Sequence, residues 1–142
     1  MSIDGLKIGL RHENSIMVDE ALTVPAVSRA FKGFADMPPV LATAFLIGFV
    51  EWTCVEALRP FLFAEQRTVG VHVDLSHSAA TPIGMRVTAS VELAAIDGRK
   101  LRFKVVCRDE AEVVCEGTHD RFIIDEARFM ARLEKKRKDR AE

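Results

Sequence analysis

The longest apolar run in the chain lies between Met37 and Pro60. Thr43 lies early in this run and Glu51 lies late in it, and no broad polar stripe appears before Glu56. A segment that is apolar on nearly every side predicts a helix that is buried nearly all round. Because an unpaired hydroxyl or carboxylate is costly to bury, Thr43 and Glu51 need either a hydrogen-bonding partner or a function.

Prolines mark both ends of this predicted helix. Pro38 and Pro39 fix an extended entry, and Pro60 ends the helix. Thr43 stands where an N-cap residue is expected. Gly48 lowers the helix propensity in mid-helix, which indicates that another backbone passes close to it.

Most of the remaining chain alternates between apolar and polar residues with the period of two that is typical of strands. Asp97-Gly98 is the strongest hairpin signal in the chain, and Gly117 indicates a bulge in the last strand. The predicted strands are residues 14–24, 68–77, 85–97, 101–108 and about 111–124.

The same alternation assigns each strand residue to a face. His77 falls on the core-facing side of its strand, whereas His72 falls on the solvent-facing side. The other predicted core-facing positions are Val71, Val73, Leu75, Val87, Ala89, Val91, Leu93, Ala95, Leu101, Phe103, Val105 and Cys107.

Two further segments flank the predicted sheet and helix. Residues 26–36 form a loop or helical turn in which Phe31 and Phe34 share a face, and which is either a local hydrophobic plug or a lid over a pocket. From Asp125 onward the pattern predicts a helix. Its charged end, residues 134–140, is interpreted as a solvated tail.

Together these elements predict one α+β domain over residues 1–142, with an antiparallel sheet curled around one long buried helix and a C-terminal helix and basic tail over 126–142. Hydrophobic residues make up 49% of the chain and charged residues 29%, as in globular proteins. The net charge of −1 gives no indication of nucleic acid or an anionic membrane as a partner. The central run is shorter than the roughly 20 apolar residues that a membrane span needs.

The cysteines bear on the compartment and on metal binding. Cys54, Cys107 and Cys115 lie in apolar segments without metal-ligand spacing, which favours free thiols in a reducing compartment. The N-terminus has no signal-peptide pattern, so we expect a cytoplasmic protein. The chain has no phosphate-binding glycine loop, dinucleotide fingerprint or metal-ligand cluster, so we expect neither a metal nor a cofactor.

Thr43, Glu51 and His77 are polar where the pattern predicts burial. A hydroxyl, a carboxylate and an imidazole are the parts of an acyl-transfer site. Each residue also has a structural explanation, as a helix cap, a buried ion-pair partner and a hydrogen-bonded core histidine, and the pattern alone favours these. On one straight helix Thr43 and Glu51 lie roughly 12 Å apart along the axis and cannot touch. His119 is interpreted as a hydrogen-bonded strand residue, and Cys54 as a packing residue.

Four motifs resemble the fluoroacetyl-CoA thioesterase group within the hotdog-fold thioesterases. The resemblance extends over residues 9–135 and implies the hotdog fold for the predicted sheet and helix. The motifs are Ala-Thr-Ala-Phe (42–45), Val-Glu-Trp-Thr-Cys-Val (50–55), Ser-His-Ser-Ala-Ala-Thr-Pro-Ile-Gly (76–84) and Gly-Thr-His-Asp-Arg (117–121).

The resemblance implies roles for individual residues. The catalytic set at these motif positions is Thr43, Glu51 and His77, and a backbone N–H near the acyl group comes from the glycine that matches Gly70. The group also has two lid phenylalanines. The implied substrate-binding residues are Gly70, Phe34, which matches the first lid phenylalanine, Met37, which replaces the second, and Arg121. The replacement at Met37 puts fluoroacetyl specificity in question.

The implied function is hydrolysis of a small acyl-CoA thioester by a homodimer, or by a higher oligomer, with sites at the subunit interface. Because Thr43 and Glu51 are too far apart on one helix, we expect a second copy to complete a compact site. Two alternatives stay open: a hotdog enoyl-CoA hydratase or dehydratase, and a non-catalytic dimer that binds acyl-CoA.

Overall fold

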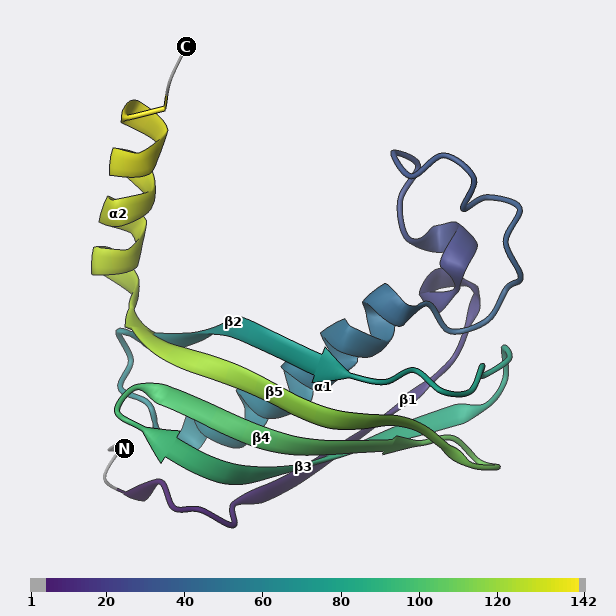
Figure 1. The fold of residues 1–142 in the computed structure, drawn as a ribbon, viewed down its shortest axis with the longest axis horizontal. Helices are drawn as coiled ribbons and strands as arrows, with labels where there is room; N and C mark the ends of the chain where they lie inside the picture. Colours follow the sequence, from purple (N-terminus) through teal and green to yellow (C-terminus); the bar gives the residue numbers. More distant parts are fainter. Residues whose placement is uncertain (1–4, 141–142) are drawn as a thin grey trace.

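The computed structural model describes residues 5–140 and consists of a five-stranded antiparallel sheet, a long helix against its concave face and a C-terminal helix (Figure 1). The strand order across the sheet is β1-β3-β4-β5-β2. The strands are β1 (Arg11–Met17), β2 (Gln66–Leu75), β3 (Arg86–Asp97), β4 (Lys100–Arg108) and β5 (Val113–Asp125). The helices are α1 (Thr43–Leu58) and α2 (Glu126–Lys138), and short 3₁₀ turns span Glu20–Leu22, Val24–Ala26 and Arg59–Phe61.

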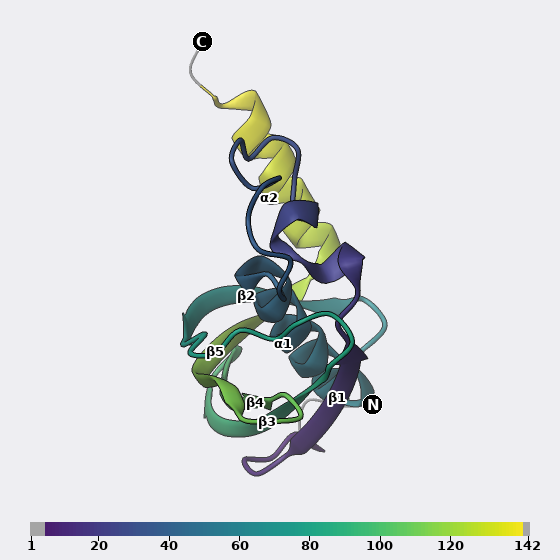
Figure 2. The same ribbon diagram turned by 90° about the vertical axis from the view of Figure 1, so that its right-hand side faces the viewer.

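The sheet curls around α1, as the end-on view in Figure 2 shows, so the predicted α+β arrangement is confirmed. The core lies between the helix and the central strands β3, β4 and β5. Leu46, Val50, Cys54 and Leu58 of α1 are at most 1% exposed. The strand residues of the core are Val87, Ala89, Val91, Leu93, Leu101, Phe103, Val105, Cys107, Val114, Cys115 and Ile123.

The predicted inward alternation holds along β4 and along β3 as far as Leu93, but it is wrong for Ala95. The pairing register of β3 and β4 shifts between Leu93 and Ala95. After this bulge Ile96 is the residue that pairs with the buried Leu101, and Ala95 is exposed. A single extra residue in a strand reverses the side-chain parity that follows it, and the hydrophobic pattern contains no sign of it.

The first strand differs from the predicted range of 14–24. Strand β1 ends at Met17, and the following chain turns into 3₁₀ geometry because Asp19 caps it, its side chain accepting a hydrogen bond from the Ala21 backbone N–H at 3.0 Å. The inner face of β1 is polar at two positions. There the Asn14 side-chain amide donates to Glu56 of α1 at 2.7 Å, and His12 lies 3.4 Å from the same carboxylate oxygen.

Helix α1 is less enclosed than its composition predicts. The sheet covers one side of the helix, while Ala44 and Gly48 are exposed and Trp52 is 45% exposed. The prediction of a close backbone neighbour at Gly48 is wrong within this protomer, because a Cβ atom built there meets nothing within 4 Å. Thr43 is the first residue of the helix and not its N-cap, which is Ala42.

Strand β2 forms an open edge of the sheet. Val73 and Leu75 face inward, since they pair with His119 and Gly117 of β5, but Val73 is 43% exposed and Val71 is 51% exposed. Val71 lies where the β2–β5 register shifts, between Gly70 and His72. The predicted burial of Val71 and Val73 is therefore wrong for a single protomer, because no segment within residues 5–140 covers this edge.

Gly117 does not interrupt the β5 pairing as a bulge would. Its φ of +147° and the close approach of the Asp74 carbonyl of β2 to its missing Cβ explain the glycine.

Helix α2 begins at the predicted place and extends away from the sheet (Figure 1). Asp125 caps it, since its carboxylate accepts a hydrogen bond from the Arg128 backbone N–H at 3.2 Å. None of the residues of α2 is buried, and Met130 is 56% exposed. Within residues 5–140, no helix has the length and apolar character needed to cross a membrane.

Candidate active site

A hydroxyl and an imidazole meet at the start of α1. Thr43 is exposed, and its Oγ1 lies 2.7 Å from Nδ1 of His77. The hydroxyl donates to Nδ1 when the neutral imidazole carries its proton on Nε2. In that tautomer His77 can take the proton from the threonine oxygen. The structure thus brings together Thr43 and His77, two of the three residues that the sequence indicated.

His77 lies two residues beyond the end of β2, yet its backbone is fixed. The neighbouring N–H groups of Ser76 and Ser78 donate to Glu116 and Val114 of β5 at 2.8 and 2.9 Å, so the pairing continues past Leu75. The other ring nitrogen of His77, Nε2, is buried and has no hydrogen-bond partner among residues 5–140. An unpaired buried polar atom is costly and is often found where a protein binds or transforms a ligand.

Burial sets the protonation state of His77. The half-buried imidazole loses hydration, which lowers the pKa of His77 below its ordinary value. The ring is therefore neutral at pH 7, which is the state that a general base needs.

The backbone around Thr43 adds an electrostatic feature. No side chain within residues 5–140 caps the first turn of α1, although the N–H groups of a first helical turn have no carbonyl partner within the helix. These groups and the positive end of the helix dipole attract a developing negative charge. The exposed Thr43 oxygen thus lies beside donors suited to an oxyanion.

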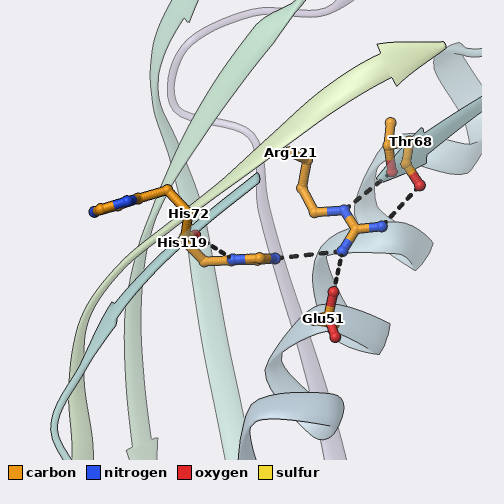
Figure 3. A network of polar contacts seen from close by, with 5 residues as sticks. All are labelled: Glu51, Thr68, His72, His119 and Arg121. Atoms are coloured by element: carbon orange, nitrogen blue, oxygen red, sulfur yellow. Dashed lines mark hydrogen bonds and ion pairs between the residues drawn. The ribbon is translucent and has the colours of Figure 1, made fainter. Parts of the chain in front are cut away.

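Glu51 belongs to a second polar centre, further along α1 (Figure 3). Its Oε2 accepts a hydrogen bond and ion pair from Nη1 of Arg121 at 2.7 Å. The Arg121 side chain is only 6% exposed, and its other nitrogens donate to the side-chain and backbone oxygens of Thr68 at 3.1 and 2.8 Å. Glu51 itself is 42% exposed, so its carboxylate joins a buried cation to the open side of the helix.

His119 supports this centre as a neutral acceptor. Its Nδ1–H donates to the backbone carbonyl of His72 at 2.8 Å, and its Nε2 lies 3.3 Å from Nη1 of Arg121. Burial, reinforced by the nearby Arg121 charge, lowers the pKa of His119. The interpretation of His119 as a hydrogen-bonded strand residue is confirmed. Figure 3 shows the His72 ring directed away from this cluster, on the solvent side as predicted.

Gly70 of β2 lies directly against the Glu51 carboxylate. A Cβ atom at this position would be 2.6 Å from Oε2 of Glu51, 3.2 Å from Cε1 of His119 and 3.3 Å from Nη1 of Arg121. Real Cβ atoms essentially never come as close as the first distance. The absence of a side chain at Gly70 therefore lets β2 close over the ion pair.

The two centres are separate within one protomer. No hydrogen bond joins Glu51 to Thr43 or His77 in the part of the chain that the structure describes. Eight residues of helix correspond to roughly 12 Å of rise between Thr43 and Glu51. Arg121, which the resemblance implies as a substrate-binding residue, lies inside the protomer and pairs with Glu51.

Phe34 and Met37, at the positions where the resemblance implies a lid, lie in the loop that leads into α1. This loop projects beyond the N-terminal end of the helix (Figure 1). Phe31 and Phe34 pack edge to face, with ring centroids 5.5 Å apart. Phe34 is half-buried, while Phe31 is 52% exposed and Met37 is 46% exposed. Because Phe31 and Met37 are exposed, the loop is not a hydrophobic plug that is sealed within the protomer.

Sequence reasoning missed Thr68 and the partners of Glu56. Thr68 was assigned only to the start of a strand, although a β-branched hydroxyl opposite a buried arginine is a natural hydrogen-bond acceptor. The polar residues His12 and Asn14 repeat every second position in β1, and this period of two was the available signal for a polar inner face.

The cysteine thiols are buried and unreactive, and the described residues form no metal site. Cys54, Cys107 and Cys115 are free and buried, and burial raises the pKa of Cys54 to about 12, which leaves an unreactive thiol. Within residues 5–140, no three His, Cys, Asp or Glu side chains come together as metal ligands.

Comparison with solved structures defines the fold. A hot-dog-like protein from Thermanaerovibrio acidaminovorans is 20% identical with a TM-score of 0.79, and the match covers 94% of each chain. A thioesterase superfamily member from Thermus thermophilus is 21% identical with a TM-score of 0.83, and the match covers 93% of each chain. The curled sheet around α1 is therefore the hotdog fold.

Closer relatives define the family. The model of the fluoroacetyl-CoA-specific thioesterase family matches residues 18–127. The fluoroacetyl-CoA thioesterase of Streptantibioticus cattleyicolor is 35% identical over 133 residues, which is 94% of this chain and 96% of the relative. A solved structure of the fluoroacetyl-CoA thioesterase FlK is 34% identical with a TM-score of 0.90, and the match covers 94% of this chain and 98% of that one. The chain belongs to this family of thioester hydrolases.

The lowered pKa of His77 can be tested by titration. We expect the His77 ring proton resonances to titrate with a midpoint below about 6.5 in the folded protein, because burial disfavours the imidazolium. In urea the midpoint should return to about 6.5. Since the folded-state pKa is the lower one, the contribution of His77 to stability is present above about pH 6.5 and is lost as the pH falls below it. His77→Gln assigns the resonance, and a folded-state midpoint at or above 6.5 would contradict the burial argument.

The packing of Gly70 against Glu51 can be tested with a double-mutant cycle. Gly70→Ala should lower the free energy of unfolding by about 1–3 kcal/mol, because the added methyl group overlaps the carboxylate. In a Glu51→Ala background the same substitution should cost at least about 1 kcal/mol less, since the nearest clashing atom is gone. Urea unfolding followed by circular dichroism measures both. Equal costs in the two backgrounds would show that Gly70 is not needed for the carboxylate.

Proposed function

We propose that this protein hydrolyses a small acyl-CoA thioester to the free acid and CoA. The observation that carries the proposal is the Thr43–His77 pair, 2.7 Å apart at the uncapped N-terminus of α1. The family assignment supports the chemistry, and solved structures of FlK variants include one with acetyl-CoA and one with fluoroacetate and CoA. A metal or a cofactor is not part of the proposal.

The proposed reaction begins at Thr43. Its oxygen attacks the thioester carbonyl while His77 takes the hydroxyl proton, and the N–H groups of the first helical turn stabilise the oxyanion. The CoA thiolate leaves without a strong general acid, because thiols have a pKa of about 8.5. Water activated by Glu51 then hydrolyses the acyl-threonine. In the other route Thr43 only binds the carbonyl, and His77 and Glu51 direct the water onto the thioester itself.

The proposal includes a homodimer whose second copy covers the open side of α1. This helix is apolar all round, yet Ala44, Gly48 and Trp52 are exposed on the side that the sheet leaves bare. The adjacent edge strand β2 exposes Val71 and Val73. Exposed apolar side chains on a helix face and on a free strand edge are typical of a subunit interface.

A dimer also resolves the separation of the two polar centres. Thr43 and Glu51 lie toward opposite ends of the helix face that is exposed, and Glu51 is 42% exposed there. A two-fold axis across this face places two copies of α1 antiparallel, so that Glu51 of one chain approaches the Thr43–His77 pair of the other. Further pairing of dimers is compatible with the exposed surface of α2.

We propose a small acyl group for the substrate and a cytoplasmic location for the protein. Phe34 and Met37 lie in the loop that leads into α1, whose first residue is Thr43, and we propose that they select a small acyl group. Met37 stands where the related enzymes have a second lid aromatic, so a preference for fluoroacetyl-CoA is not part of the proposal. The three free, buried cysteines support a reducing, cytoplasmic location.

The catalytic proposal can be tested with a panel of short and medium acyl-CoA esters, following thiol release. We expect hydrolysis of the small esters, and a fall in kcat/KM of about 10²–10⁴-fold in Thr43→Ala, Glu51→Gln and His77→Ala. Thr88→Ala, which removes a threonine on the outer face of the sheet bonded to Ser15, is the matched control and should keep the wild-type rate.

The panel also separates the alternatives. Consumption of an enoyl-CoA without thiol release would identify a hydratase. Saturable binding of CoA esters in calorimetry without turnover would identify a non-catalytic binder. Full activity in all three site variants would remove the proposed roles of Thr43, Glu51 and His77.

The dimer can be tested at the edge of β2. We expect sedimentation equilibrium to give twice the chain mass of 15.8 kDa for the wild type, and Val73→Lys to shift the protein toward monomer with loss of activity. The charged side chain would be buried in the interface without a partner. Ile8→Lys, at a residue that is 64% exposed away from this edge, is the control. A monomeric, fully active wild type would refute the interface.

A further inference from the structure

A cleft of about 510 Å³ lies where β5 passes into α2, beside the β3–β4 hairpin. Three arginines line it: Arg99 of the hairpin, and Arg128 and Arg132 of α2. Arg128 and Arg132 are four residues apart and therefore share one face of the helix. None of the roles proposed above involves these three side chains.

The residues that the structure describes do not neutralise the guanidinium groups in this cleft. Within residues 5–140 no ion pair includes Arg99, Arg128 or Arg132. Asp125 is the one carboxylate that lines the cleft, and it accepts the Arg128 backbone N–H as the cap of α2. Three cations against one anion leave an excess of two positive charges in a concave surface. Arginine is well suited to hold phosphate there, because its planar fork binds two oxygens at once.

An aromatic side chain lies beside these arginines. Phe122 of β5 is 38% exposed and lines this cleft together with an adjoining one that contains Lys100 and Val71. An exposed phenylalanine beside cations offers a stacking surface for a heterocyclic base. The combination fits a phosphorylated nucleotide better than a simple anion or an acidic peptide.

The position of the cleft connects it to the polar centre inside the sheet. Phe122 and Arg121 are consecutive on β5 and point to opposite faces, so Phe122 lines the outer cleft while Arg121 holds Glu51 within. Val69 and Gly70 of β2 pair with these two residues at the free edge of the sheet. A flexible chain that crosses this edge beside Gly70 leads from the cleft to the Glu51 carboxylate.

We propose that this arginine cleft binds the phosphorylated adenosine end of the CoA thioester, an assignment that rests on the proposed function. Arg99, Arg128 and Arg132 hold the phosphates, Phe122 stacks on the adenine, and the pantetheine arm crosses the β2 edge. Helix α2 and the N-terminal end of α1 lie at opposite ends of the molecule (Figure 1). In the two-fold dimer, the cleft of one protomer therefore serves the acyl site at the start of the partner's helix.

The test uses the double variant Arg128→Gln/Arg132→Gln, since α2 has no buried residue and the change spares the core. The substrates are the acyl-CoA that turns over fastest and the N-acetylcysteamine thioester of the same acid, which lacks the nucleotide. We expect KM for the acyl-CoA to rise about tenfold or more with kcat nearly unchanged, because each lost contact is a charge-assisted hydrogen bond. The KM for the truncated thioester should not change.

The control variant is Arg137→Gln, which removes the same charge further along α2 from an arginine already paired with Glu134 at 2.8 Å. It should leave KM for both substrates at the wild-type value. An unchanged KM for acyl-CoA in the double variant, or an equal rise for the truncated thioester, would overturn the assignment.

A binding measurement keeps the subsite and the catalytic proposal separable. Adenosine 3′,5′-bisphosphate is titrated into the wild type and the double variant by calorimetry. We expect saturable binding to the wild type that the double variant loses. Binding of equal strength to both proteins, or to neither, would overturn the subsite. If the wild type hydrolyses neither thioester, the proposed function fails, and this titration still decides whether the cleft binds the nucleotide.

Discussion

The fold depends on how the protein compensates the positive charge of Arg121, whose side chain is almost entirely buried. An uncompensated charge in such a place is costly enough to unfold a small domain. The structure satisfies it with the Glu51 carboxylate of α1 and the two oxygens of Thr68, while His119 stays neutral beside it. One cation thus ties the helix to β2 and β5. Gly70 makes this arrangement sterically feasible, because any side chain there would displace the carboxylate.

The repeating features of the sequence predicted much of this fold, because burial on one face of a strand imposes a period of two on the residues. The β3–β4 hairpin, the core-facing set of β4 and the inward placement of His77 all follow from that period. The bulges after Leu93 and at Val71 could not be predicted, since one unpaired residue reverses the parity without any change in composition. The partner of Glu51 was also missing, because Arg121 lies 70 residues away and no local pattern relates the two.

Apart from Ala95, which follows the bulge in β3, the burial predictions that failed lie on α1 and on the edge strand β2. Gly48 lacks a close neighbour, and Val71, Val73 and Trp52 are exposed, all along the open side of α1 and the adjoining edge of β2. A sequence is selected for the surface that is buried in the working assembly, whereas a single protomer exposes whatever its partner would cover. The proposed homodimer would cover these apolar side chains, which the pattern places inside and a single protomer leaves outside.

The separation of the two polar centres follows from the geometry of an α-helix and has a chemical advantage. Thr43 lies at the positive N-terminal end of α1, whereas Glu51 pairs with the buried cation of β5 beside the edge strand β2, and one helix cannot offer both at one point. Glu51 stays paired with Arg121, and burial lowers the pKa of His77, which is the neutral base of the proposed reaction. In the proposed dimer the two centres meet only between two chains, so each is stabilised by its own surroundings before they form one site.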